Sequence, residues 1–280
     1  MFILPIPGPA AKPIKLSVGG TNIFARARGD AQALIYGMNI TASDSVAMVL
    51  PLPTPPGVGE DAVRFIDLSA YSKVFVDLNE LFPPVMPPQP RGGSAFGGGA
   101  PVKTTLKVHD AGDFEASFVP SFADIDRIDP RFRLPEGIWD ALSQYRDWSF
   151  AVFQLRDVAE PPRGLRRVFG GLRPKTIHPM ALEFPRRFAD RLFFPTVHLH
   201  DGTVHEHDTF DHALFWQQDP GAKGTFWAET PTYTPTLHTL ETANTQVDIA
   251  ATQGLIDGDA IVYRQDLHGL HPNQDHWVLA

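Results

Sequence analysis

The sequence predicts an α+β fold built mostly on an antiparallel sheet or sandwich, with a few short helices and a histidine-rich β-hairpin. The 280 residues include 27 prolines and 23 glycines, and so many turn-forming residues favour short elements over a helical bundle. Hydrophobic residues make up 43% of the chain and charged residues 20%, which is typical of a globular protein. Strand-like segments dominate the order of elements, and helix-like segments fall between them, which is typical of an antiparallel sheet with added helices.

Alternating segments within residues 14–52 predict the first two or three strands. The first segment, KLSVGG, ends in Gly19-Gly20, where we expect a turn, and NIFARARGDAQALIYGMNI and SVAMVLPLP follow it. Residues 28–30 read Arg-Gly-Asp, the letters of an adhesion tripeptide. Glycine and aspartate between two alternating segments predict a hairpin turn instead.

Helices are predicted within residues 59–83, where three acidic residues suit helix beginnings and Pro83-Pro84 stops the second helix. Residues 83–101 are rich in proline and glycine and predict a flexible loop. The later elements, in chain order, are a hairpin over 103–121 that turns at 110–113, helices at 122–128 and 134–148, strands at 149–157 and 176–185, the histidine hairpin at 193–216, a short helix at 242–256 and a strand at 258–267.

The domain organisation follows from where this regular pattern ends. We expect one main domain over residues 1–218, which contains the flexible loop at 83–101. Residues 219–280 are less regular and are expected to form a C-terminal extension packed on the main domain. The chain is long enough to bury a sizeable core.

Charge and composition limit the classes of function. The formal net charge is −8 and the basic stretches are short, so we expect no nucleic-acid partner. The chain contains no cysteine, which excludes disulfides, thiolate catalysis and cysteine-ligated metal centres. No run approaches the roughly 20 apolar residues of a membrane helix, and the N-terminus makes a poor signal peptide. We therefore expect a cytoplasmic protein that binds a small molecule or another protein and does not associate with a membrane.

Histidines carry the main functional signal, because five of the eleven lie within residues 193–216. Asp201-Gly202 between two strand-like arms predicts a β-hairpin. Side chains alternate along a strand, so four imidazoles would share one face of this hairpin and apolar residues would occupy the other. These four are His198, His200, His205 and His207.

The same pairing assigns places to the neighbouring polar residues. Asp211 would lie on the histidine face and Asp208 on the other, and either is expected to join through a bend or to orient an imidazole. His212 would face away from the group. Cβ atoms of directly opposed residues lie about 5 Å apart, so imidazoles at these positions can converge on one ion with bonds of about 2.0–2.1 Å.

Three or four neutral imidazoles suit a divalent transition metal, namely Zn, Cu, Fe or Ni. Three ligands would leave a position open for water or substrate, as in catalytic sites, whereas four would close the site. The competing interpretation is a wet, polar hairpin tip whose imidazoles bind nothing.

Other candidates are weaker. LHGLHPNQDHW (267–277) holds three more histidines, but its glycine and proline argue against a helical metal pair. We expect a polar loop or tail, with the alternative that it folds back and adds a ligand. The sequence has neither a G-x-S-x-G nucleophile elbow nor a G-x-G-x-x-G loop after a strand, so no hydrolase triad or dinucleotide site is indicated.

Three stretches resemble those of an uncharacterised bacterial family: SVAMVLPLPTPPG, VHDAGDFEASFVPSFADIDRIDPRFRLPEGIWDALSQYRDWSFAVFQLRD and IHPMALEFPRR with RLFFPTVHLHDGTVH. The resemblance covers roughly residues 35–216. It implies an α+β domain, and it carries over no catalytic residues because the family has no established activity.

The sequence therefore predicts a metal-binding protein that uses a histidine cluster on a β-hairpin, with a metal-dependent hydrolase or oxidoreductase as its catalytic form. The alternative is a non-catalytic β-rich interaction module with a solvent-exposed histidine patch. Nothing in the sequence decides whether the protein is an enzyme, and nothing indicates its oligomeric state.

Overall fold

A computed structural model describes residues 2–5, 16–42, 46–82, 108–111, 114–128, 143–155, 175–176, 178–199, 204–218 and 236–280. Within them the strands are β1 (Phe2–Pro5), β2 (Leu16–Arg28), β3 (Ala31–Ala42), β4 (Val46–Leu52), β5 (Arg64–Asp67), β6 (Val108–Ala111), β7 (Phe114–Val119), β8 (Ser149–Leu155), β9 (Lys175–Thr176), β10 (Met180–Pro185), β11 (Arg191–Phe194), β12 (His207–Gln217), β13 (Leu237–His238), β14 (Tyr263–Pro272) and β15 (His276–Leu279). The α-helix is α1 (Val74–Glu80), and 3-10 turns lie at Ser69–Tyr71, Phe122–Arg127, Ser143–Tyr145, Ala243–Thr245 and Ala250–Thr252.

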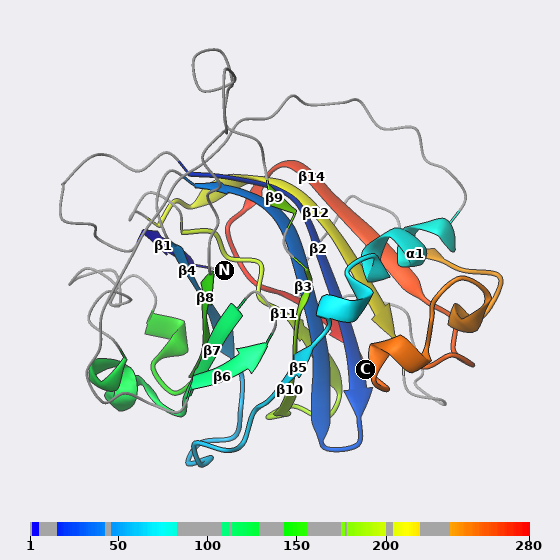
Figure 1. Cartoon of the computed structure of the whole chain (residues 1–280). Coiled ribbons are helices and arrows are strands. Elements are labelled where there is room, and N and C mark those ends of the chain that lie inside the picture. The colour runs from blue at the N-terminus through cyan, green and yellow to red at the C-terminus, as the bar shows by residue number, and fades with distance from the viewer. Residues whose placement is uncertain are drawn as a thin grey trace, which may run out of the picture.

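Two large sheets form the body of the molecule (Figure 1). The five-stranded sheet has the order β1-β4-β8-β7-β6, and the eight-stranded sheet has the order β13-β14-β12-β2-β3-β10-β5 with β9 paired to β3. Every pair in the two sheets is antiparallel except β12 with β2, which run parallel. A third, two-stranded sheet joins β11 to β15.

The prediction of an α+β fold is wrong, because the described chain is β-rich and its helical segments are short. Residues 59–83 hold the strand β5, a 3-10 turn and α1. Asp67, a predicted helix beginning, instead accepts the backbone N–H of Ser69 at 2.7 Å, and this local bond competes with a helix. The predicted helices at 122–128 and 242–256 are 3-10 turns, and most of 134–148 lies outside the described residues, as does the 83–101 loop.

The first hairpin joins β2 to β3 at the Arg-Gly-Asp segment, as predicted. Arg28 pairs with Ala31, and Gly29 has a φ of 58°, which glycine adopts without steric cost. The turn expected at Gly19-Gly20 is absent, because β2 runs through it. The register of β2 against β3 shifts between Gly19 and Asn22, so the glycine pair makes a bulge inside the strand.

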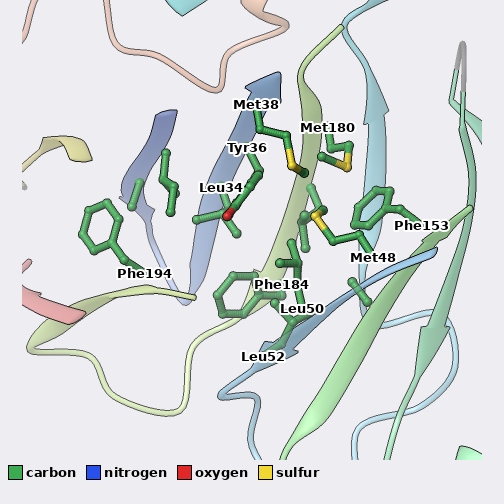
Figure 2. Packing of buried hydrophobic residues seen from close by; sticks show 14 of the residues in the cluster. Leu34, Tyr36, Met38, Met48, Leu50, Leu52, Phe153, Met180, Phe184 and Phe194 are labelled. Carbon is green, nitrogen blue, oxygen red and sulfur yellow. The ribbon is translucent and has the colours of Figure 1, made fainter. Parts of the chain in front are cut away.

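Buried apolar side chains fill the space between the two large sheets. Figure 2 shows side chains of β3 and β10 meeting those of β4 and β8, among them Leu34, Met38, Met48, Leu50, Phe153 and Met180. The other face of the eight-stranded sheet is covered by α1 and the 3-10 turns after residue 242, as Figure 1 shows. Strands buried on both faces need apolar residues at successive positions, and β12 has four of them, all buried, from Ala213 to Trp216.

Residues after 218 supply strands to this framework. β14 pairs with β12 along ten positions, from His207 opposite Pro272 to Trp216 opposite Tyr263. β15 pairs with β11. The division into a main domain at 1–218 and an extension stays a prediction, but β13, β14 and β15, which lie within 219–280, belong to the sheets. Among the described residues, no helix combines the length and apolarity needed to cross a bilayer.

Candidate functional site

The two arms of the predicted histidine hairpin do not pair with each other in the described residues. The first arm contains β11, which pairs with β15, and the second is β12, which pairs with β14 and β2. Leu199 makes an isolated bridge with Phe2. Asp201-Gly202 lies outside the described residues. A turn signal is local, whereas the strands that occupy an arm's two edges come from distant parts of the chain.

The structure separates the predicted metal ligands by burial. His198 is 5% exposed, whereas His205 and His207 are exposed and His200 lies outside the described residues. Within the described parts of the chain, no three His, Cys, Asp or Glu side chains are grouped so that they could hold a metal ion. The four-histidine site therefore stays a prediction.

His198 instead meets His212, the histidine that the hairpin pairing turns away from the group. Their Nε2 atoms lie 3.2 Å apart, and their ring centroids are separated by 4.8 Å. His212 is 2% exposed, so both imidazoles are removed from bulk water. The expectation for His212 is wrong because it assumes the hairpin pairing, which the structure replaces with pairing to β14 and β2.

Alternation along β12 places the pair. Phe210 and His212 point inward, whereas Thr209 and Asp211 are exposed. The His198 ring stacks on Phe210 at a centroid distance of 4.4 Å and an interplanar angle of 21°. This apolar platform fixes the plane of the imidazole and leaves its ring edge to meet His212.

The bulge in β2 opens a small hollow beside the pair. β2 pairs with β12 from Thr21, opposite His212, onward. The bulge in β2 lies where this pairing begins. The Gly20 N–H donates to Asp211 Oδ2 at 2.9 Å and ties the bulge to the strand. The hollow of about 90 Å³ is lined by Val18, Gly19, Thr21, His198, Asp208, Thr209, Asp211 and His212.

Two carboxylates give this hollow a negative charge when the imidazoles are neutral. Asp208 Oδ2 lies 3.4 Å from His198 Nδ1, and Asp208 Oδ1 accepts the Thr209 N–H at 2.7 Å. Asp211 Oδ1 lies 3.4 Å from Nδ1 of His268, which stands opposite it on β14. Among the described residues that line the hollow there is no lysine or arginine, so its charge favours a cation.

The hydrogen bonds assign one proton to each ring. The Asp211 N–H donates to His212 Nδ1 at 3.3 Å, which leaves the proton of His212 on Nε2. That Nε2–H then donates to His198 Nε2, and the proton of His198 lies on Nδ1 towards Asp208. Asp208, His198 and His212 thus lie in a row, with 3.4 Å between Asp208 Oδ2 and His198 Nδ1 and 3.2 Å between the two Nε2 atoms.

Side chains of the turn between β14 and β15 hold the segment that carries His198. The Asp275 carboxylate accepts the N–H groups of Thr196 and Val197 at 2.9 and 3.1 Å, and the Tyr145 hydroxyl donates to it. Burial raises the pKa of the Asp275 carboxyl, while these donors oppose the shift. Burial lowers the pKa of His276 to about 4, and repulsion from His271 adds to the effect.

The sequence predicts a polar loop or tail here, with the alternative that it folds back and adds a ligand, and it does not indicate that side chains of this turn hold the backbone of Thr196 and Val197. The one usable signal is the polar run Asn273–His276 directly before the apolar Trp-Val-Leu of β15. His268 and His271 lie on β14 and are not a helical pair, as predicted. They stand opposite Asp211 and Asp208, so the predicted tail does fold back onto the histidine strand.

A second hollow, of about 500 Å³, is lined by Arg26, Arg28, Ala31, Arg64 and Glu183. Arg28 and Arg64 both pair with the Glu183 carboxylate, and Arg26 pairs with Asp257 at 2.7 Å. Each guanidinium group thus has a carboxylate partner in the same chain, with two of the three sharing Glu183, and we take the histidine hollow as the stronger candidate site.

Comparison with known proteins adds no function. No family model and no curated protein matches the chain. A crystal structure of baculovirus P35 matches at 10% sequence identity and a TM-score of 0.39, over 95% of this chain and 99% of that one. A similarity this low carries no argument about fold or role, and the resemblance to an uncharacterised bacterial family stays a prediction.

Proposed function

We propose that the protein binds a divalent transition metal ion, Zn, Cu, Fe or Ni, between His198 and His212. The observation that carries the proposal is the 3.2 Å separation of their Nε2 atoms. Two nitrogens that each lie about 2.0–2.1 Å from one tetrahedral ion are about 3.3 Å apart, so little movement of the rings is needed.

The surroundings of the pair also support a cation. Asp208 lies behind His198 on the Nδ1 side, and a carboxylate in that place orients a metal-bound imidazole and raises its basicity. Asp211 lines the same hollow and offers an oxygen donor. Two imidazoles and one carboxylate leave coordination positions for water or a small molecule, and an ion held in this way supplies Lewis-acid or redox chemistry to a hydrolase or oxidoreductase.

A second candidate function is proton transfer without a metal. It is favoured by the Asp211 N–H that points at His212 Nδ1, because a ring that accepts there carries its proton on Nε2 and has no lone pair for an ion. Metal binding requires this contact, 3.3 Å long, to open. In the alternative, Asp208, His198 and His212 act as a general acid–base relay for a ligand in the hollow.

Metal analysis decides between the two. Protein purified without a histidine tag or a nickel column is expected to carry near-stoichiometric metal, and His198→Ala or His212→Ala is expected to lower the affinity for Zn²⁺ by at least about 100-fold. His207→Ala is the matched control, because it removes an exposed imidazole from the same strand.

Each outcome has a distinct meaning. Loss of affinity in His198→Ala and His207→Ala, with none in His212→Ala, would favour the four-histidine set over the pair. If the purified protein is metal-free and added Zn²⁺ does not change its melting temperature, metal binding is refuted. The remaining functions are then the proton relay and an interaction module with an exposed histidine patch. The proposed compartment remains the cytoplasm, and the proposed partner remains a small molecule or a protein.

A further inference from the structure

The side chain of Asn273 bonds both backbone polar groups of His198. β11 ends at Phe194, four residues before His198. The His198 N–H donates to Asn273 Oδ1 at 2.6 Å, and Asn273 Nδ2 donates to the His198 carbonyl at 3.0 Å. The side-chain amide therefore occupies the place of a peptide group in an antiparallel ladder.

The same amide also joins the two histidine arms. Asn273 Nδ2 donates to the His205 carbonyl at 3.1 Å, so one side chain spans residues on both sides of the segment around 200. The backbone of Asn273 is itself fixed, because its N–H donates to the Glu206 carbonyl at 2.9 Å. Residue 273 is thus tied to the chain before and after the predicted turn.

Neighbours of Asn273 extend the grip along the segment. Thr196 Oγ1 donates to the Gln274 carbonyl at 2.8 Å, so it accepts from Nδ1 of His276, 2.7 Å away. Residues 273–276 thus form hydrogen bonds with three consecutive residues, Thr196, Val197 and His198. With the backbone fixed in this way, only the side-chain torsions of His198 remain, and stacking on Phe210 restricts those.

We infer that Asn273 is a positioning residue for the histidine pair. It sets the affinity of the pair for a metal ion without touching the ion. The inference rests on the proposed function. A metal site tolerates displacements of only a few tenths of an ångström in its ligands, so loss of the amide acts on binding through the placement of the His198 ring.

Gln32 provides a matched control on the same segment. Its amide donates to the Phe193 carbonyl at 2.7 Å and accepts the Phe193 N–H at 2.9 Å, the same pair of bonds five residues earlier. Gln32→Ala therefore removes a buried amide that makes the same pair of bonds, and Asn273→Ala removes the half-buried amide beside the site. Asn273→Asp keeps the acceptor for the His198 N–H but replaces both donors with a carboxylate oxygen, which the two carbonyl oxygens repel, and it gives a second variant if Asn273→Ala does not fold.

The experiment titrates each full-length protein with Co²⁺, followed by visible absorption, and then displaces Co²⁺ with Zn²⁺. Asn273→Ala or Asn273→Asp is expected to weaken Zn²⁺ binding by about 10- to 100-fold and to change the Co²⁺ spectrum, whereas Gln32→Ala shifts the affinity by less than about 3-fold. Circular dichroism establishes that each protein is folded at the titration temperature.

The outcomes separate the two proposals. If the wild-type protein shows no Co²⁺ spectrum and no Zn²⁺ binding, the proposed metal function fails and this role of Asn273 falls with it. If the wild-type protein binds and the Asn273 and Gln32 variants lose affinity equally, the metal function stands and the positioning role is overturned. Unchanged affinity in a folded Asn273 variant would likewise overturn the positioning role.

Discussion

Acidification is expected to destabilise the protein through His276, the histidine of the turn between β14 and β15. His276 is 2% exposed, and burial lowers the pKa of its imidazole from 6.5 to about 4. The unfolded chain therefore takes up a proton as the pH falls below 6.5, whereas the folded protein does so only near pH 4. Stability from this group is present above pH 6.5 and is lost as the pH falls towards 4.

The size of the effect follows from the two pKa values. One pKa unit corresponds to about 1.36 kcal/mol, so a fall from 6.5 to about 4 gives a loss of about 3 kcal/mol once the pH is well below 4. At pH 5 the unfolded chain is almost fully protonated and the folded protein is hardly protonated, and the loss is about 2 kcal/mol. At pH 8 the loss is close to zero.

His276→Asn isolates this contribution. The Asn amide has a donor near the place of Nδ1, which donates to Thr196 Oγ1 in the wild-type protein, but it does not titrate. Asp275 and His271, the titratable neighbours, are present in both proteins and largely cancel in the comparison. Only the change in stability between pH 8 and pH 5 is compared, so the cost of the substitution itself does not enter.

Urea unfolding, followed by tryptophan fluorescence at pH 8, 6.5 and 5, gives the free energy of unfolding of each protein. The wild-type protein is expected to lose about 2 kcal/mol more than His276→Asn between pH 8 and pH 5. Parallel curves, within about 0.5 kcal/mol, would refute the reasoning and mean that His276 titrates as freely in the folded protein as in the unfolded chain.

Further predictions concern packing and the site. Leu214→Ala on β12, where the side chain is fully buried, should cost about 2–5 kcal/mol in urea unfolding, and a loss below 1 kcal/mol would contradict this packing. Gly37→Ala should cost about 1–3 kcal/mol, because a Cβ there would lie 2.8 Å from ring atoms of Phe75, while Gly59→Ala, with nothing within 4 Å, should change stability by less than about 0.5 kcal/mol. Zn²⁺ at 100 times its Kd should stabilise the wild-type protein by about 2.7 kcal/mol in thermal unfolding and leave His212→Ala unchanged, and equal stabilisation of both proteins would move the ion elsewhere.

Strands with local partners could be predicted from the sequence. Of the predicted helices in the described residues, the one that ends before Pro83-Pro84 forms, as α1, whereas the others are a strand or 3-10 turns. β2 and β3 alternate on both sides of Gly29-Asp30, so their pairing needs no information from elsewhere in the chain. The acidic residues of 59–67 resemble a helix beginning, but Ile66 and Asp67 pair with β10, more than 100 residues later. Local propensity is a weak guide where a sheet edge captures the segment.

The candidate site shows the same limit. Both the sequence and the structure make His198 a candidate ligand. The sequence predicts that its partner lies across a turn, whereas in the structure its partner is His212, on a strand whose neighbours are β14 and β2. The period of two on β12 does place Phe210 and His212 on one face, and the sequence contains this information. The role of Asn273 is not predictable, because no pattern links a polar turn to a backbone 75 residues earlier.

The parallel pair of β2 and β12 has a consequence for how the protein is made. Thr21 and His212 are neighbours in the middle of the eight-stranded sheet, and β14, on the far side of β12, comes from the C-terminal end of the chain. During synthesis, β2 and β3 leave the ribosome before β12 and β14 are made. The apolar side chains that these later strands cover are exposed until then. Such distant pairing slows folding and favours aggregation of incomplete chains, so a product cut before residue 263 should be insoluble rather than a smaller working protein.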